Sequence, residues 1–165
     1  MQTLFAPWRF SYVSVSSQTE DCFFCEAAAE PDNPERLVVH VSEHYMVMLN
    51  LHPYTNGHLM VAPLKHIDAP LAMDEDESGE FWPLVLRSQE VLKKAYSPEG
   101  FNLGMNLGRA AGAGLPDHFH FHIVPRWSGD TNFMSVLAGV RVVPEEPSQI
   151  LDRLRPLFAK ILRPS

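Results

Sequence analysis

The sequence predicts a single α+β domain, residues 1–165, with a mainly antiparallel sheet of five strands. Three observations lead to this fold class: the segments with strand character are short, one long helical pattern stands between the third and the fourth of them, and no internal repeat is present. The predicted strands are 36–41, 44–50, 58–63, 101–106 and 118–125. Short strands with a single long helix among them favour α+β over an alternating parallel arrangement.

The first segments of the chain differ in character. Residues 1–20 are rich in aromatic side chains and poor in helix signals, which predicts an arm that docks on the domain body or on a partner subunit. Residues 22–30 (CFFCEAAAE) predict a short helix that the PDNP segment at 31–34 stops. PYTNG at 53–57 has the composition of a turn between the second and third strands.

The long helical pattern runs from Asp74 to Tyr96, with Phe81, Val85 and Ser88 on one face. Pro83 lacks a backbone N–H donor, so the regular helix is expected to begin or to kink near it. A glycine-containing loop, 107–117, follows the fourth strand. The tail, 147–165, is predicted as a C-terminal helix, chiefly over 147–162, that is broken near Pro156.

Composition excludes several classes of protein. Lys plus Arg number 13 and Asp plus Glu number 20, giving a formal net charge of −7, which argues against nucleic acid as a main partner. The N-terminus MQTLFAPWRF has no apolar signal-peptide core, and no apolar run is long enough to cross a membrane. The expected setting is therefore the cytoplasm, with no membrane partner.

The stretch DHFHFHIVPRW, 117–127, places His118, His120 and His122 at alternate positions. Residues two apart on a strand share a face, so the three imidazoles project together while Phe119 and Phe121 face the core. Three interpretations are open: the polar side of an ordinary half-buried strand, three ligands of one zinc ion, or phosphorus chemistry. In the last, a neutral imidazole attacks phosphorus and its neighbours bind phosphate oxygens and move protons.

The stretch HFHFHIV resembles the motif that names the histidine triad (HIT) superfamily of nucleotide hydrolases and transferases. Further segments resemble the bacterial branch that contains diadenosine tetraphosphate phosphorylases, and together they cover most of residues 4–135. They are LFAPWRFSYV, CFFC, LNLHPYTNGHLMVAPLKH, GFNLGMNLGRAAGAGLPDH and VPRWSGDTNFM. The resemblance implies the HIT fold, a nucleotide substrate and a homodimer formed by joining two five-stranded sheets.

The resemblance also implies roles for single residues. His120 takes the position of the nucleophile that attacks the α-phosphorus, His122 the position that holds phosphate oxygens and helps to move protons, and His58 that of a supporting histidine on the adjacent strand. The implied nucleoside and phosphate contacts are Met48, Asn50, Leu51 and Asn106. Taken one by one, these four residues would pass as core or turn residues; only the linked motifs favour a functional reading.

The loop GRAAGAGLPDH, 108–118, is a candidate phosphate cradle. Glycines such as Gly112 and Gly114 permit positive φ and let backbone N–H groups converge on an anion, although ordinary turns share this composition. Many triad proteins carry Gln, Ser or Thr here, whereas this chain has Ala113, Leu115 and Pro116. Direct side-chain contacts with phosphate are thereby lost, as in the GAG stretch of the phosphorylase-like branch.

Cys22 and Cys25 are the two cysteines of the chain, and their CxxC spacing is half of a zinc site. On the residues alone, a redox pair or two buried thiols are the alternatives to a metal site. The resemblance to triad proteins and to galactose-1-phosphate uridylyltransferases implies that His66 and His118 complete the site. Two thiolates and two imidazoles would make a closed structural site with one zinc per chain.

The sequence thus predicts an enzyme that transfers a nucleotidyl group from dinucleoside polyphosphates to phosphate or water. Two rivals stay close: a nucleoside phosphoramidase or adenylyl-ester hydrolase, and a zinc-stabilised nucleotide-binding module without turnover. A zinc-dependent hydrolase with all three triad histidines on one metal is a further alternative.

Overall fold

The computed structural model describes residues 22–130 and 145–161. The predicted N-terminal arm, 1–20, and the last residues of the predicted C-terminal helix lie outside the described residues. No helix in the described ranges is long and apolar enough to cross a membrane.

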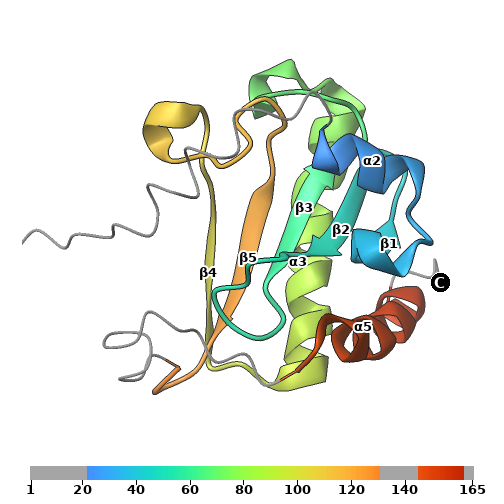
Figure 1. The fold of residues 1–165 in the computed structure, drawn as a ribbon, viewed down its shortest axis with the longest axis vertical. Helices are drawn as coiled ribbons and strands as arrows, with labels where there is room; N and C mark the ends of the chain where they lie inside the picture. The colour runs from blue at the N-terminus through green and yellow to red at the C-terminus, as the bar shows by residue number, and fades with distance from the viewer. Residues whose placement is uncertain (1–21, 131–144, 162–165) are drawn as a thin grey trace, which may run out of the picture.

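A five-stranded antiparallel sheet forms the centre of the domain, as predicted (Figure 1). Its spatial order is β1-β2-β3-β5-β4, so β1 and β4 are the two edges. The strand bounds are β1 Val38–Val41, β2 Tyr45–Leu49, β3 Leu59–Pro63, β4 Gly100–Met105 and β5 Phe121–Arg126. All four neighbouring pairs are antiparallel.

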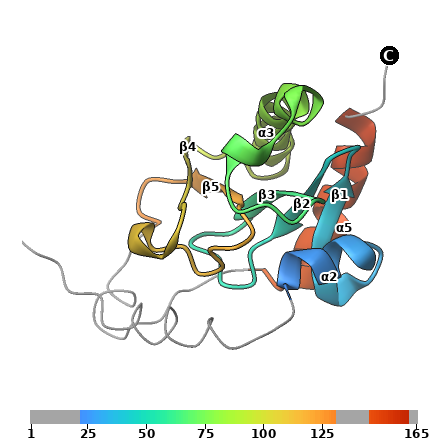
Figure 2. The ribbon, with the colours of Figure 1, turned by 90° about the horizontal axis from the view of Figure 1, so that it is seen from above.

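Helices cover both faces of the sheet (Figure 2). The long helix α3, Glu75–Tyr96, lies on one face and the short helix α2, Phe23–Ala29, on the other, while α5, Pro147–Ile161, packs against α3 and β1. Strand β2 is therefore buried along its whole length. Tyr45, Val47 and Leu49 join the α3-side core, whereas Met46 and Met48 join an apolar cluster with Phe24 of α2.

Two helices continue through an internal proline, where the sequence had predicted a helix start or kink at Pro83 and a break at Pro156. A capping box between Asp74 and Glu77 begins α3 well before Pro83, and α5 runs through Pro156. Both prolines are exposed, and so are Gly79 and Asp152, the residues four positions earlier whose carbonyls lose a bonding partner. Water can solvate these carbonyls, so the expected kink at Pro83 and break at Pro156 are not needed.

The last strand differs from its predicted bounds in a way that matters for function. β5 begins at Phe121, so His118 and His120 precede the hydrogen-bonded strand. The alternation nevertheless continues through them: Phe119 and Phe121 lie in the α3-side core, and the histidines project to the opposite face. That face is the side of the sheet on which α2 packs.

Candidate active site and metal centre

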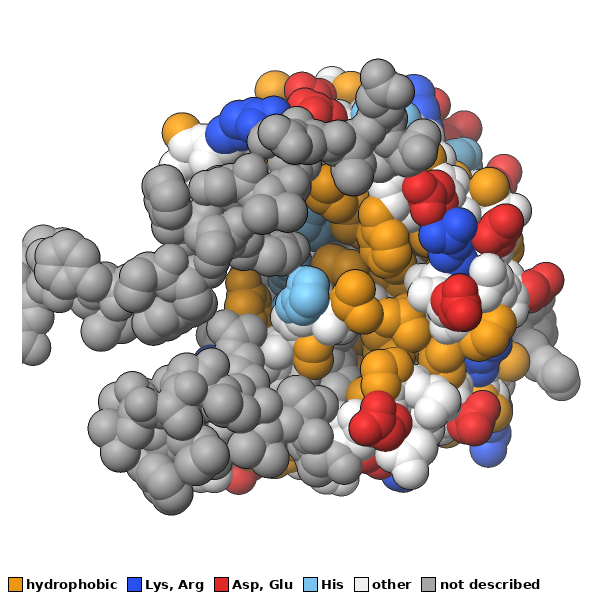
Figure 3. Space-filling view, viewed as in Figure 1, with side chains coloured by type: hydrophobic (Ala, Val, Ile, Leu, Met, Phe, Trp, Pro, Cys, Tyr) orange, Lys and Arg blue, Asp and Glu red, His pale blue; other side chains and the backbone are white. Residues whose placement is uncertain are grey.

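The triad histidines and His58 form a connected cluster on the α2 side of the sheet. The rings of His120 and His122 are 4.9 Å apart between centroids, and Nε2 of His58 lies 3.0 Å from Nδ1 of His122. His58 enters from the end of the PYTNG turn, just before β3, which pairs with β5. Viewed from this side, histidine side chains lie among hydrophobic ones near the middle of the molecule (Figure 3).

Backbone contacts define which nitrogens carry protons. The backbone N–H of Tyr54 donates to Nδ1 of His58 at 3.1 Å, so neutral His58 carries its proton on Nε2 and donates to Nδ1 of His122. Neutral His122 must then carry its own proton on Nε2. This chain of bonds makes His122 an N–H donor, the form that suits contact with a phosphate oxygen.

His120 has the opposite arrangement. Its Nδ1 lies 3.0 Å from the carbonyl oxygen of His118, and because a carbonyl only accepts, Nδ1–H is the donor. The lone pair is thereby on Nε2. Burial lowers the pKa of His120 below 6.5, against the opposing effect of this hydrogen bond, so Nε2 is unprotonated at neutral pH. An imidazole in this state is a competent nucleophile.

The pKa of His122 predicts a loss of stability in acid. Burial, and next the neighbouring His120, lower the pKa of His122 from 6.5 to about 4. Above pH 6.5 this residue is neutral in the folded and unfolded states. Between pH 6.5 and about 4 only the unfolded chain takes up the proton, so the stability contributed by His122 is lost as the pH falls through this window.

The measurement is urea unfolding at several pH values across this range. The free energy of unfolding should fall with pH in the wild type and fall less steeply in His122→Gln, whose amide does not titrate. Equal slopes in the two proteins would show that His122 is not the titrating group.

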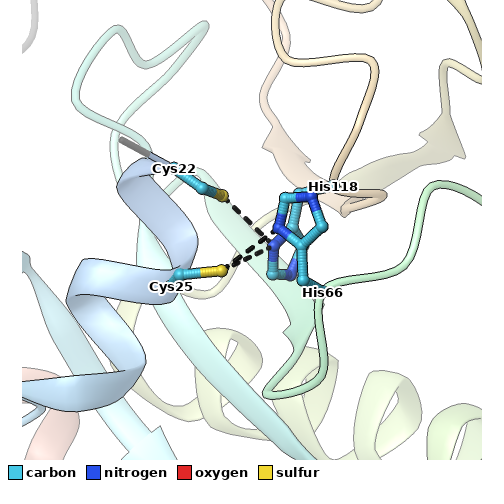
Figure 4. A group of neighbouring side chains, drawn as sticks. All are labelled: Cys22, Cys25, His66 and His118. Carbon is cyan, nitrogen blue, oxygen red and sulfur yellow. Dashed lines mark hydrogen bonds between the residues drawn. The ribbon is translucent and has the colours of Figure 1, made fainter. Parts of the chain in front are cut away.

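The second cluster joins the CxxC pair to two histidines (Figure 4). Cys22 and Cys25 stand at the start of α2, three residues apart and therefore on one side of the helix. Nδ1 of His118 lies 3.3 Å from Sγ of Cys22, and Nδ1 of His66 lies 3.2 Å from Sγ of Cys25. One ligand atom from each residue lies within 4.8 Å of the other three.

These four residues have the geometry and chemistry to hold one metal ion. Ligand atoms around tetrahedral zinc are roughly 3.4–3.8 Å apart for bonds of about 2.0–2.3 Å, close to the spacings found here. Nε2–H of His118 donates to the carbonyl of Pro63 at 2.9 Å, which directs the Nδ1 lone pair at the thiols. Burial lowers the pKa of His118 to about 4, so that lone pair is available at neutral pH.

The thiols need a cation to become thiolates. Burial, followed by the neighbouring Cys22, raises the pKa of Cys25 to about 11 in the protein alone. A bound metal ion reverses this effect because its charge favours the deprotonated sulfur. The donor set therefore fits a cation better than it fits a pair of reactive thiols.

The predicted nucleoside contacts occupy different depths. Met48 is fully buried and Leu51 is 59% exposed, so the two side chains do not line a common base pocket in this structure. Met48 nevertheless shares a cross-strand row with the triad, because Met48 pairs with Met60 and Met60 pairs with His122. Asn50 is half-buried after β2, and Asn106 lines a groove beside His122.

The glycine loop is partly closed by its own turn. Gly112 has φ 84°, and its N–H donates to the carbonyl of Arg109 at 2.9 Å. The N–H of Ala113 donates to the carbonyl of Gly108. Two amides of the predicted cradle are thus used inside the loop, which leaves the end near Gly114 as the part able to meet an anion.

Comparisons with known proteins identify the family. The HIT domain family is matched over residues 30–129. The chain belongs to the HIT family. It is 35% identical over 96% of its length to an AP-4-A phosphorylase of Mycobacterium tuberculosis, of which the match covers 83%. It is 38% identical over 66% of its length to an uncharacterized HIT-like protein of Methanocaldococcus jannaschii, of which the match covers 81%.

Solved structures of HIT proteins share the fold. A hypothetical histidine triad nucleotide-binding protein from Sulfolobus tokodaii superposes with a TM-score of 0.67 at 28% identity. A Zn-bound histidine triad family protein from Mycobacterium smegmatis also gives 0.67, at 23% identity. Each comparison covers 86% of this chain and 95% of the other.

The structure places two further side chains at the candidate site that the sequence analysis did not name. The ring of Tyr54 stacks on His58 with centroids 4.9 Å apart, and Arg126 lines the same groove as His122. The signal for Arg126 was present, because it lies four residues after His122 and so shares its face. For Tyr54 the signal was weak, since a tyrosine in a PYTNG turn is usually a surface residue.

Asn50 offers a sharp test of where a nucleoside binds in this HIT domain. Its Oδ1 accepts from the backbone N–H of His52 at 2.8 Å, so the amide NH₂ is the half that could donate to a ligand hydroxyl. Loss of that contact in Asn50→Ala should cost about 1–2 kcal/mol of ribonucleotide binding, roughly tenfold in Kd. A 2′,3′-dideoxynucleotide lacks the hydroxyls and should bind wild type and variant alike.

Asn50→Asp is the companion variant, because its carboxylate keeps the bond to His52 while it loses the amide donor and gains a negative charge, which ribo and dideoxy nucleotides meet alike. Calorimetric titration of the three proteins with both nucleotides separates the two roles. Equal weakening of ribo and dideoxy binding in Asn50→Ala would make Asn50 a turn residue only.

Proposed function

We propose that this chain is a nucleotidyl hydrolase or transferase acting on dinucleoside polyphosphates of the diadenosine tetraphosphate type. The observation that carries the proposal is the His120 ring, whose bonded Nδ1–H leaves a lone pair on Nε2. Membership of the HIT family and the identity with the AP-4-A phosphorylase support the substrate class.

The reaction would proceed through a covalent nucleotidyl-histidine intermediate. Nε2 of His120 attacks the α-phosphorus, a P–N bond forms, and the P–O bond to the leaving polyphosphate breaks. His122, kept as an N–H donor by His58, binds an oxygen of the transferred phosphate while negative charge builds up on it. Phosphate or water then attacks the same phosphorus, breaks the P–N bond and returns the lone pair to His120.

The donated nucleotide would lie between the triad and the loop after β2. Asn50 is placed to bind the ribose hydroxyls, and Met48 and Leu51 line the base side. Asn106, together with the loop end at Gly114, would contact phosphate oxygens, whereas the N–H of the predicted Gly112 is bound within the loop. These assignments rest on the family motif and on the common sheet face of Met48, Met60 and His122.

The metal centre would hold one structural zinc ion per chain. A set of two thiols and two imidazoles is the donor chemistry that zinc prefers, and four protein ligands leave no open position for a substrate. When bound, zinc supplies a cross-link between α2 and the sheet. His118, fixed by that cross-link, offers its carbonyl to His120 and so sets the ring orientation of the nucleophile.

The enzyme would act as a homodimer joined along β4. This edge strand, GFNLGM, contains no charged residue and no proline, the features that usually protect an exposed edge. Leu103 of β4 and Trp82 and Leu86 of α3 are all more than a third exposed. Light scattering on the eluted protein should give about twice 18.6 kDa, and Leu103→Lys should lower the mass toward one chain.

The deciding experiment is incubation with diadenosine tetraphosphate, with and without inorganic phosphate, followed by chromatography of the products. ATP with ADP identifies phosphate as acceptor, and ATP with AMP identifies water. Adenosine phosphoramidate, offered in parallel, tests the phosphoramidase alternative. Binding of these compounds without any turnover would instead support a nucleotide-binding module.

A further inference from the structure

A shallow groove of about 370 Å³ runs along β4 and β5 on the face that carries His122. His122, Val124 and Arg126 alternate along its β5 side, and at about 3.4 Å per residue Arg126 stands roughly 14 Å beyond His122. The other lining residues used below are Tyr54, Asn102 and Gly104. The groove thus begins beside His122 and continues the direction that leads from His120 through His122 along β5 to Arg126, two strands away from the end of β2 that carries Asn50.

The opening beside His122 depends on a glycine. Gly104 of β4 pairs directly with His122 of β5, and a Cβ built at Gly104 meets no atom within 4 Å. Across the sheet the row reads Met48, Met60, His122 and Gly104. One side of His122 is therefore filled by buried methionines, and the other side is kept open by the missing side chain.

The far end of the groove presents fixed N–H donors. Arg126 donates from Nε and Nη2 to Asp130, at 2.5 and 2.8 Å, and from Nη1 to Oδ1 of Asn102 at 2.6 Å. A guanidinium has five N–H donors, so two are not used by these bonds, and Asn102 is left with its NH₂ as donor. Because both partners lock the guanidinium in place, little side-chain entropy is lost when a ligand oxygen binds.

Tyr54 forms the opposite wall at the near end. Its ring stacks on His58 and lies 6.3 Å from the His122 ring, and the hydroxyl of Thr55 ties the loop to the carbonyl of Pro125 at 2.7 Å. The groove therefore has an aromatic wall, a glycine floor and a donor-rich end. That combination suits a long oxygen-rich ligand with a flat aromatic part.

We propose that this groove binds the leaving half of the substrate, a nucleoside polyphosphate, with Arg126 and Asn102 donating to its oxygens. The inference rests on the proposed function. In an in-line displacement the leaving group departs opposite the attacking Nε2 of His120, so the leaving half would extend away from His120, as the row from His122 to Arg126 does. The groove would favour dinucleoside polyphosphates over nucleotides with a small leaving group.

The test compares two substrates that share an adenylyl half: diadenosine tetraphosphate and adenosine phosphoramidate. Gly104→Val fills the near end of the groove and Arg126→Gln removes the donors at its far end. The ratio of kcat/KM, tetraphosphate over phosphoramidate, should fall about tenfold in each variant, because Arg126→Gln loses charge-assisted hydrogen bonds to the leaving half and Gly104→Val obstructs its path. Arg87→Gln, an exposed arginine of α3, should keep the ratio within about twofold.

Unchanged ratios in both groove variants, or equal losses on both substrates in correctly folded protein, would overturn the inference. If the wild type turns over neither substrate, the proposed function is wrong, but the groove can still be tested by measuring ligand binding with calorimetry. The tetraphosphate should then bind more tightly than AMP to the wild type, and Gly104→Val should remove the difference. Equal binding of the two ligands by the wild type would reject the groove itself.

Discussion

Replacing His120 with alanine is expected to abolish turnover of diadenosine tetraphosphate while the fold persists. The variant has no nitrogen to accept the nucleotidyl group, so kcat should fall at least about 1,000-fold. The structural cost is small: the ring makes one hydrogen bond, to the carbonyl of His118, and packs 4.8 Å from the ring of Phe24. Losing the bond should cost about 1–2 kcal/mol of stability.

Two readouts accompany the assay. Mass spectrometry of wild-type protein quenched during turnover should show a nucleotidyl adduct on the peptide that contains His120, and thermal unfolding should show a folded variant. His44→Ala is the matched control, because His44 is a histidine paired with Glu80 of α3 at 2.7 Å and has no contact with the triad in the described chain. Full activity in His120→Ala would end the covalent mechanism.

The histidine stretch shows what a sequence pattern can and cannot predict. Phe119 and Phe121 must be buried, so the alternation correctly predicted which face the histidines share. It could not predict that the hydrogen-bonded strand begins only at Phe121, since that depends on where β3 and β4 supply partners: Val61 and Met105 both pair with Phe121. The carbonyl of His118 therefore lies before β5 and accepts from Nδ1–H of His120. This bond leaves the lone pair of His120 on Nε2.

The other features of the candidate site depend on contacts between residues that lie far apart in the sequence. The CxxC spacing predicted half of a metal centre, and the family resemblance predicted the other half, which the structure brings within ligand distance. The proton arrangement of His58 and His122 depends on the backbone N–H of Tyr54, which no side-chain pattern reveals. The groove likewise depends on the register that sets Gly104 opposite His122.

Removal of the metal is expected to destabilise the protein strongly. Helix α2 has only seven residues, too few to be stable alone, and it is fixed by Phe24 and Ala27 in the apolar cluster and by the Cys–His contacts. Loss of a structural zinc ion should cost about 3–5 kcal/mol, which lowers Tm by roughly 10 °C in a domain of this size. Elemental analysis of protein purified without added metal should give one zinc per chain.

Cys25→Ser and chelator-treated wild type should show the same lowered Tm and the same loss of zinc, and added Zn²⁺ should restore only the wild type. Lys65→Ala is the control, because Lys65 is the neighbour of the candidate ligand His66 in the sequence but is not one of the four candidate ligands. Its Nζ lies 3.6 Å from Oε1 of Glu77. With four protein ligands the proposed site has no open position, so a chelator should lower stability before it inhibits a short assay. Inhibition at once, with Tm unchanged, would mean that the metal works in the reaction and that the closed structural site is wrong.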